Sequence, residues 1–155
     1  MEKALIIVDY QNDFIDGSLG FEKARLIKDD ILLLLKEFDG DLIFTLDTHY
    51  TNYLETREGK NLPILHCQDK SHGHKMPSEF DKYIEKAKKI FKKQSFASLE
   101  LANFIREQNY KQIEFCGLVS HICVFSNIIL AFNAALNAEI ILHSKATASH
   151  DDELE

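Results

Sequence analysis

The chain has 155 residues, 45% hydrophobic and 28% charged, a composition typical of one globular domain with a sizeable core. Its 18 Lys and Arg residues against 25 Asp and Glu give a net charge of -7, which repels phosphate backbones, so we expect no nucleic-acid partner. Apolar runs such as residues 4–8 and 31–35 are much shorter than the roughly 20 residues of a membrane span, and we expect no membrane association.

The N-terminus and the cysteines indicate a cytoplasmic protein. The chain passes directly from Met1 into a strand-like segment, without the small-residue cleavage site of a secretory signal. Its three cysteines, Cys67, Cys116 and Cys123, are an odd number and are interpreted as reduced thiols rather than a disulfide framework. One of them is therefore available as a nucleophile.

The first half of the chain begins with a strand at residues 4–8, because consecutive apolar residues favour a strand covered on both faces. Apolar residues at helical spacing predict a helix over residues 22–38, and a second strand is expected over 41–46. Residues 48–77 are expected to be irregular, and loops of this length are usually functional.

The second half continues the alternation of helix and strand. We expect, in order, a short charged helix at 78–86, a strand at 89–91, a helix at 98–108 with Ser98 as N-cap, a strand at 112–116, a turn at 117–121, a helix at 122–137 and a strand at 139–143.

This alternation predicts an α/β fold, a three-layer α/β/α domain with a parallel, doubly wound, Rossmann-like sheet of five or six strands. We expect a single domain over residues 1–155. Another helix normally follows the last strand of such a sheet, so the domain is expected to be short at its C-terminus.

Four reactive side chains follow strands or begin helices in this scheme: Asp9, Asp47, Lys93 and Cys123. Because ligands of open parallel sheets bind at the carboxyl ends of the strands, we expect these groups to share one edge of the sheet. Each alone has an ordinary explanation, since an Asp after a strand is often a turn residue and a single Lys is usually solvated.

Cys123 is the best candidate nucleophile. A thiol in the first turn of a helix lies at the positive end of the helix dipole, which favours the thiolate. The alternative is a buried apolar role, common for free cysteines, and Cys116 inside a strand fits that alternative well.

Three segments containing these residues carry a family resemblance. They are VDYQNDF at residues 8–14, KQSF at 93–96 and GLVSHICV at 117–124. In this order they resemble the isochorismatase-like cysteine hydrolases, a superfamily that includes the nicotinamidases. The resemblance implies a catalytic triad of Asp9, Lys93 and Cys123. It also implies a cis peptide bond between Val119 and Ser120 that helps to form an oxyanion hole near Ser120 and Cys123.

The long loop contains candidate metal ligands: Asp47, His49, Glu58 and His66. Spacing alone is equally compatible with a catalytic Zn²⁺, Mn²⁺ or Fe²⁺ site and with solvated loop residues. The resemblance favours the metal, because nicotinamidases bind one through an Asp-x-His pair, a later His and, in some members, a Glu between them. Isochorismatase-type members lack this set. His72 and His74 match no ligand position and are expected to be exposed.

Four further side chains are candidates for the substrate pocket: Tyr10 and Phe14 beside Asp9, Phe96 near Lys93, and His121 before Cys123. Core packing is the alternative for the aromatic residues. His121 stands where the family usually has an acid or amide. The Trp positions common among nicotinamidases are occupied by Thr48 and Leu62.

The first hypothesis is a metal-dependent nicotinamidase that hydrolyses nicotinamide to nicotinate and ammonia, with Zn²⁺ as the expected metal. The second is a cysteine hydrolase of another small amide, carbamoyl compound or ureide, and the third is a non-catalytic oligomeric member. The expected partners are a small-molecule amide and further copies of the chain. Nucleotide binding is disfavoured, because no Gly-rich loop follows the first strand.

Overall fold

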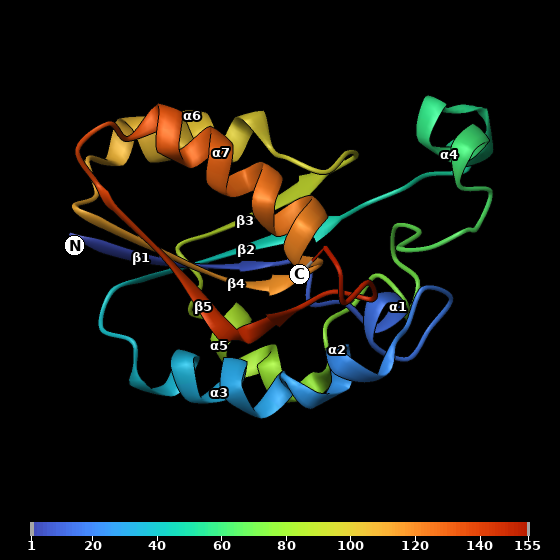
Figure 1. Ribbon diagram of the computed structural model, residues 1–155, viewed down its shortest axis with the longest axis horizontal. Helices are drawn as coiled ribbons and strands as arrows, with labels where there is room; N and C mark the ends of the chain where they lie inside the picture. The colour runs from blue at the N-terminus through green and yellow to red at the C-terminus, as the bar shows by residue number, and fades with distance from the viewer. Residues whose placement is uncertain (1, 155) are drawn as a thin grey trace.

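Strand β1 (Lys3–Val8) is buried after its first residue because its consecutive apolar side chains pack on opposite faces of the sheet. Leu5 and Ile7 belong to one hydrophobic cluster, whereas Ala4, Ile6 and Val8 belong to another. A strand with two buried faces needs a layer of helices on each side. The computed structural model, which describes residues 2–154, has this arrangement (Figure 1).

The sheet contains five parallel strands in the order β3-β2-β1-β4-β5. The chain builds outwards from β1 to β3 and then returns to the other side of β1, so the strand order reverses between β1 and β4. Such a reversal opens a crevice at the carboxyl ends of the strands. The remaining strands are β2 (Asp41–Asp47), β3 (Lys89–Lys93), β4 (Gln112–Leu118) and β5 (Glu139–Ala148).

The helices form two layers, one on each face of the sheet (Figure 1). α6 (Leu99–Gln108) and α7 (Phe125–Ala134) cover one face, and α2 (Glu22–Leu26), α3 (Lys28–Glu37) and α5 (Asp81–Ile84) cover the other. The short elements are α1 (Asn12–Ile15), η1 (Tyr53–Glu55), α4 (Arg57–Asn61), η2 (Ser78–Phe80) and the π-type turn η3 (Ser120–Val124).

The fold class is confirmed, and Ser98 caps α6 as expected, its hydroxyl accepting from the Leu101 N–H. The helix expected over 22–38 is two helices, because the chain breaks at Ile27, whose buried side chain turns into the core. The helix expected over 122–137 is replaced at its start by η3 and ends at Ala134.

β5 extends five residues beyond the expected end at His143. It is an edge strand, in which exposed polar residues such as Ser144 and Lys145 are tolerated because only one side of the strand is hydrogen-bonded. The extension brings Ser149 and His150 to the carboxyl edge of the sheet, next to η3. Within residues 2–154, no helix is long and apolar enough to cross a membrane. Met1 and Glu155, the ends of the expected domain, lie outside the described residues.

Candidate active site

Asp9 follows β1 directly and is fully buried. Its backbone is left-handed, with φ of 48°, a conformation that Asp tolerates better than most residues. The Thr45 hydroxyl donates to Asp9 Oδ1 at 2.6 Å, and the Lys93 ammonium lies 2.5 Å from Asp9 Oδ2. Burial raises the pKa of Asp9, and the Lys93 and Thr45 contacts only partly oppose this. Asp9 is therefore a carboxylate with unusual affinity for a proton.

Lys93 is the last residue of β3, where the strand register pairs it with Asp47 on β2. Its ammonium donates to the Ser95 carbonyl at 2.9 Å and lies 3.8 Å from Asp47 Oδ1. Burial alone would lower the pKa of Lys93, but the opposing charges of Asp9, Cys123 and Asp47 raise it above its usual value. The side chain is consequently a fixed positive charge.

Cys123 lies in η3, is 6% exposed and lines the cavity described below. Burial raises the pKa of the thiol well above its usual value, the Lys93 ammonium opposes this, and the Asp9 carboxylate raises the pKa further. The thiol is therefore harder to ionise than an exposed cysteine, and Asp9 and Lys93 are the charged groups that act on it. The fold thus brings Asp9, Lys93 and Cys123 together, as expected from their positions in the chain.

The expected metal ligands also converge. The ligand atoms of Asp47, His49 and His66 all lie within 4.8 Å of one another, and all three residues are buried. The His49 Nε2 and His66 Nε2 atoms are 3.0 and 3.4 Å from Asp47 Oδ2. Glu58, on α4, is less buried and lies 3.7 Å from His49 Nε2. Carboxylate and imidazole groups in this grouping suit a divalent transition metal.

Contacts behind the cluster orient these ligands. The His66 Nδ1 atom is 2.7 Å from the Ile64 carbonyl, so Nδ1 carries a proton and Nε2 is the ring nitrogen that faces the cluster. The Gln11 side chain accepts from the Asp47 N–H and donates to the Asp47 carbonyl, which fixes the backbone at that ligand. Burial would raise the pKa of Asp47, but hydrogen bonds from His49 and His66 hold it well below its usual range. These residues fit a metal.

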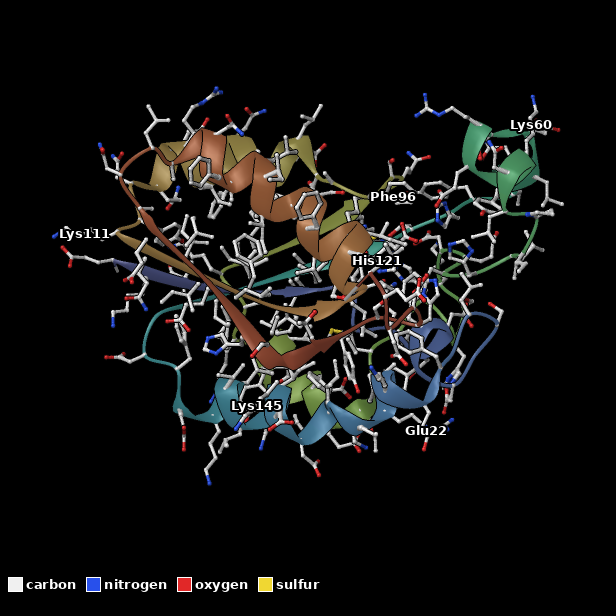
Figure 2. All side chains as sticks on the ribbon, in the orientation of Figure 1. Glu22, Lys60, Phe96, Lys111, His121 and Lys145 are labelled. Carbon is white, nitrogen blue, oxygen red and sulfur yellow. The ribbon has the colours of Figure 1, made fainter. Side chains whose placement is uncertain are left out.

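A cavity of about 300 Å³ connects the thiol with the metal cluster. Asp47, Glu58 and His66 lie on its wall together with Cys123, and most of the remaining lining is apolar. Phe14 and Phe96 line the cavity, as expected. The other lining residues are Leu19, Leu62, Val119, Ile122 and His150. Figure 2 shows Phe96 at the end of the molecule where α7 begins, near the labelled His121, with Lys60 of α4 farther out.

Two expected pocket residues are elsewhere. Tyr10 is a core residue, because the chain turns after Asp9 and directs its ring against Phe80 and its hydroxyl to the Ala24 carbonyl. His121 is not among the lining residues: it lies 2.7 Å from the Ser149 hydroxyl and packs against His150, both of which follow β5. His150 lines the cavity instead.

The turn before Cys123 differs from expectation by one residue. The cis peptide bond joins Leu118 to Val119, not Val119 to Ser120, because β4 continues through Leu118 and the chain leaves the sheet there. Val119 lines the cavity with Cys123. The Ser120 hydroxyl is buried and has no hydrogen-bond partner within the described part of the chain.

Among the other candidates, Cys67 and Cys116 are buried free thiols, and burial raises the pKa of each above its usual value. His72 is exposed, as expected. His74 is not: it is buried, because its ring packs against the Thr48 hydroxyl.

The residues that the sequence did not reveal as part of the site are those that support it. Thr45 follows from strand register, since it pairs with Val8 beside Asp9. Gln11 lies inside the VDYQNDF segment and is fully buried. A polar residue within that segment was the only sequence signal for its role. His150 and Leu19 carry no local signal, because only the path of β5 and the loop after α1 bring them to the cavity.

Comparison with known proteins places this arrangement in a family. The sequence profile of the isochorismatase domain family matches residues 3–155. The chain belongs to the isochorismatase family. One relative, from Bacillus subtilis strain 168, is described as uncharacterized isochorismatase family protein PncA. It is 33% identical over an alignment of 174 residues, gaps included, that covers 99% of this chain and 90% of the relative.

Solved structures agree with this assignment. The crystal structure of nicotinamidase/pyrazinamidase PncA from Bacillus subtilis superposes with a TM-score of 0.86 at 26% identity, covering 99% of this chain and 90% of that one. The pyrazinamidase of Pyrococcus horikoshii in complex with zinc superposes with a TM-score of 0.77 at 25% identity, covering 99% and 89%. The resemblance inferred from the three segments is confirmed.

Proposed function

We propose that this isochorismatase-family protein is a cysteine-dependent amidohydrolase that converts nicotinamide and water to nicotinate and ammonia. The observation that carries the proposal is the buried ion pair of Asp9 with Lys93, whose two charges both act on the Cys123 thiol at the wall of a cavity. The nicotinamidases among the structural relatives support this choice of substrate.

The first half of the reaction forms a thioester. Asp9 accepts the thiol proton, and the Cys123 thiolate attacks the amide carbon while Lys93 stabilises the negative charge. Backbone N–H groups near Ser120 and Cys123 stabilise the tetrahedral oxyanion, a contribution of roughly 3 kcal/mol per donor in comparable sites. Asp9 then returns the proton to the leaving nitrogen, the C–N bond breaks and ammonia departs.

The second half regenerates the thiol. Asp9 accepts a proton from water, the resulting hydroxide attacks the thioester carbon, and the C–S bond breaks. The departing sulfur receives the proton from Asp9, and the carboxylic acid is released. Because the base that activates each nucleophile also protonates each leaving group, one carboxylate with a raised pKa serves all four proton transfers.

The cavity suits a small flat amide. Phe14 and Phe96 offer apolar surface to an aromatic ring, while the thiol and the ligand cluster provide two polar points on its wall. We infer that Asp47, His49 and His66 bind a divalent metal, with Glu58 within reach. We choose Zn²⁺, as in the Pyrococcus horikoshii relative, with Mn²⁺ and Fe²⁺ as alternatives. A metal held by these residues would act as a Lewis acid towards a polar atom of the substrate.

The test is ammonia release from nicotinamide, pyrazinamide, a carbamoyl compound and a ureide by the zinc-loaded protein. We expect nicotinamide to be hydrolysed, Cys123→Ala to lose at least about a thousandfold in rate, and Cys116→Ala, a buried thiol outside the cavity, to retain activity. Removal of the metal by a chelator should abolish turnover at low substrate concentration, and added Zn²⁺ should restore it.

Other outcomes select the other hypotheses. The second hypothesis would be supported if only the carbamoyl compound or the ureide were hydrolysed, and if that activity were lost in Cys123→Ala but unaffected by chelation. No hydrolysis, together with alkylation of Cys123 no faster than that of Cys67 and Cys116, would indicate a non-catalytic member.

A further inference from the structure

A buried histidine lies behind the candidate metal cluster and outside the mechanism above. His74 is 6% exposed and is not among the residues that line the cavity. Its Nε2 atom lies 2.9 Å from the hydroxyl of Thr48, which is fully buried. Thr48 separates the two ligands Asp47 and His49 in the chain, so this contact reaches the segment that carries both.

The hydrogen-bond partners fix the direction of this contact. The Thr48 hydroxyl has a single proton, and it donates that proton to the Leu46 carbonyl at 2.9 Å. Its oxygen must therefore accept from His74, and Nε2 of His74 carries the proton. The side chain of His74 thus donates a hydrogen bond to the residue between the two ligands.

The backbone of His74 is tied to the same segment. Gln11 Nε2 donates to the carbonyls of both His74 and Asp47, at 2.9 Å each. The His74 N–H also donates to the Ser71 hydroxyl, which anchors the loop. His74 is therefore held in place independently of the contact that it makes with Thr48.

From these contacts we propose that His74 is a positioning residue of the metal centre: it acts through Thr48 to hold Asp47 and His49 in ligating geometry. The segment is also held by the Gln11 side chain at Asp47 and by two main-chain bonds, from Thr48 N–H to the Lys93 carbonyl and from His49 N–H to the Cys67 carbonyl. Those bonds persist without the imidazole, so its loss loosens the ligands without unfolding the segment. The inference rests on the metal part of the proposed function and not on the substrate.

The experiment measures Zn²⁺ affinity of the metal-free full chain by competition with a chromophoric chelator. His74→Leu removes the donor, His74→Gln keeps an N–H donor at similar reach, and Thr48→Val removes the acceptor. His72→Leu is the matched control, because His72 lies two residues away on the same loop and is exposed. Thermal unfolding of each metal-free variant reports separately on folding.

We expect His74→Leu and Thr48→Val each to weaken Zn²⁺ binding by about tenfold, and the double variant to lose little more than either single one. The Zn²⁺ affinities of His74→Gln and His72→Leu should remain within about twofold of that of the unmodified protein. If His74 served only to stabilise the fold, His74→Leu and His74→Gln variants of equal thermal stability would bind Zn²⁺ equally well.

The inference is overturned if His74→Leu binds Zn²⁺ as His72→Leu does, if Thr48→Val has no effect, or if the unmodified chain binds no Zn²⁺. Should His74→Leu not fold, the comparison of Thr48→Val with His72→Leu decides. If only the proposed function is wrong, the unmodified chain binds Zn²⁺ but releases no ammonia from nicotinamide. The Zn²⁺ affinities of the variants then still test the role of His74.

Discussion

At the scale of single residues, Asp9 combines two properties that a proton-transferring base requires. It is buried, which raises its pKa, and it is held by the Thr45 hydroxyl and the Lys93 ammonium, which keep a carboxylate tolerable in that environment. The left-handed backbone of Asp9 places it just beyond the sheet, where its N–H still donates to the Thr45 carbonyl. Its proton affinity is thus set by a small number of named contacts.

Thr45→Val should shift the pH dependence of activity. The Thr45 hydroxyl stabilises the carboxylate and so lowers the pKa of Asp9, and loss of the hydroxyl should raise that pKa. In the proposed mechanism activity requires ionised Asp9 and is lost as pH falls through its pKa, so the acid limb of kcat/KM should move to higher pH. Thr45→Ser, which keeps the hydroxyl, is the control. An unshifted acid limb in Thr45→Val would argue against Asp9 as the base.

The sequence predicted the convergence of Asp9, Lys93 and Cys123 because each lies at the carboxyl end of a strand or at the start of the helix that follows. It could not predict the direction of their neighbours. Tyr10 follows Asp9 through a turn and points into the core. His121 forms a hydrogen bond with Ser149, which is distant in the chain. Side-chain direction in irregular backbone depends on such distant contacts.

At the scale of elements, strand register assembles the site. Val8 pairs with Thr45 and Asp47 pairs with Lys93, so the residues that surround Asp9 are aligned by the backbone ladder. Thr147 on β5 donates to the Gly117 carbonyl on β4 and fixes the strand that leads to η3. Burial on both faces makes this register specific, since a one-residue slip would exchange the two cores.

Gly117→Ala should strongly destabilise the protein. Gly117 has φ of 112°, and a Cβ there would lie 2.1 Å from the Val8 carbonyl oxygen. We expect a loss of at least about 3 kcal/mol in the free energy of unfolding, measured by urea denaturation. The adjacent Cys116→Ala, which only removes a small buried side chain, should cost about 1 kcal/mol. Equal stabilities for the two variants would refute the close approach of β4 and β1.

The sequence predicted all five strands but not the length of β5. Its second half, from Ser144 to Ala148, lacks the regular alternation of apolar and polar residues that predicts a strand, because an edge strand is partly exposed to solvent. The longer strand brings His150, two residues beyond its end, to the wall of the cavity. η3 was expected as the end of a turn at 117–121 and the start of a helix at 122, because its sequence contains no Gly or Pro that would signal a π-type turn.

At the scale of the molecule, α7 presents an apolar stripe to solvent. Phe125, Ile129 and Phe132 recur at helical spacing and are 45–65% exposed, and Leu136, just beyond the end of the helix, is 85% exposed. No Asp, Glu, Lys or Arg occurs between residues 124 and 138, so the stripe offers nothing to a charged partner and meets no repulsion from its own copy. Exposed apolar patches of this kind commonly mark interfaces between protein copies.

We therefore predict self-association through α7. The mass measured by light scattering should rise with protein concentration, and Phe132→Glu should shift the equilibrium towards monomer, because pairing would bury a charge. A Glu substitution at Leu26, an exposed apolar residue on the opposite layer, is the control. A monomeric mass for the unmodified chain at every concentration would exclude this interface.

The central claim is that Cys123 is the nucleophile of an amide hydrolysis, and the most direct test is its acylation. The zinc-loaded protein is mixed with nicotinamide, quenched in acid during turnover and digested, and the peptides that carry Cys67, Cys116 and Cys123 are weighed by mass spectrometry. We predict a nicotinoyl thioester on the Cys123 peptide alone, which disappears when nicotinamide is exhausted. Ammonia release by Cys123→Ala at the rate of the unmodified protein, with no acylated peptide, would contradict the mechanism.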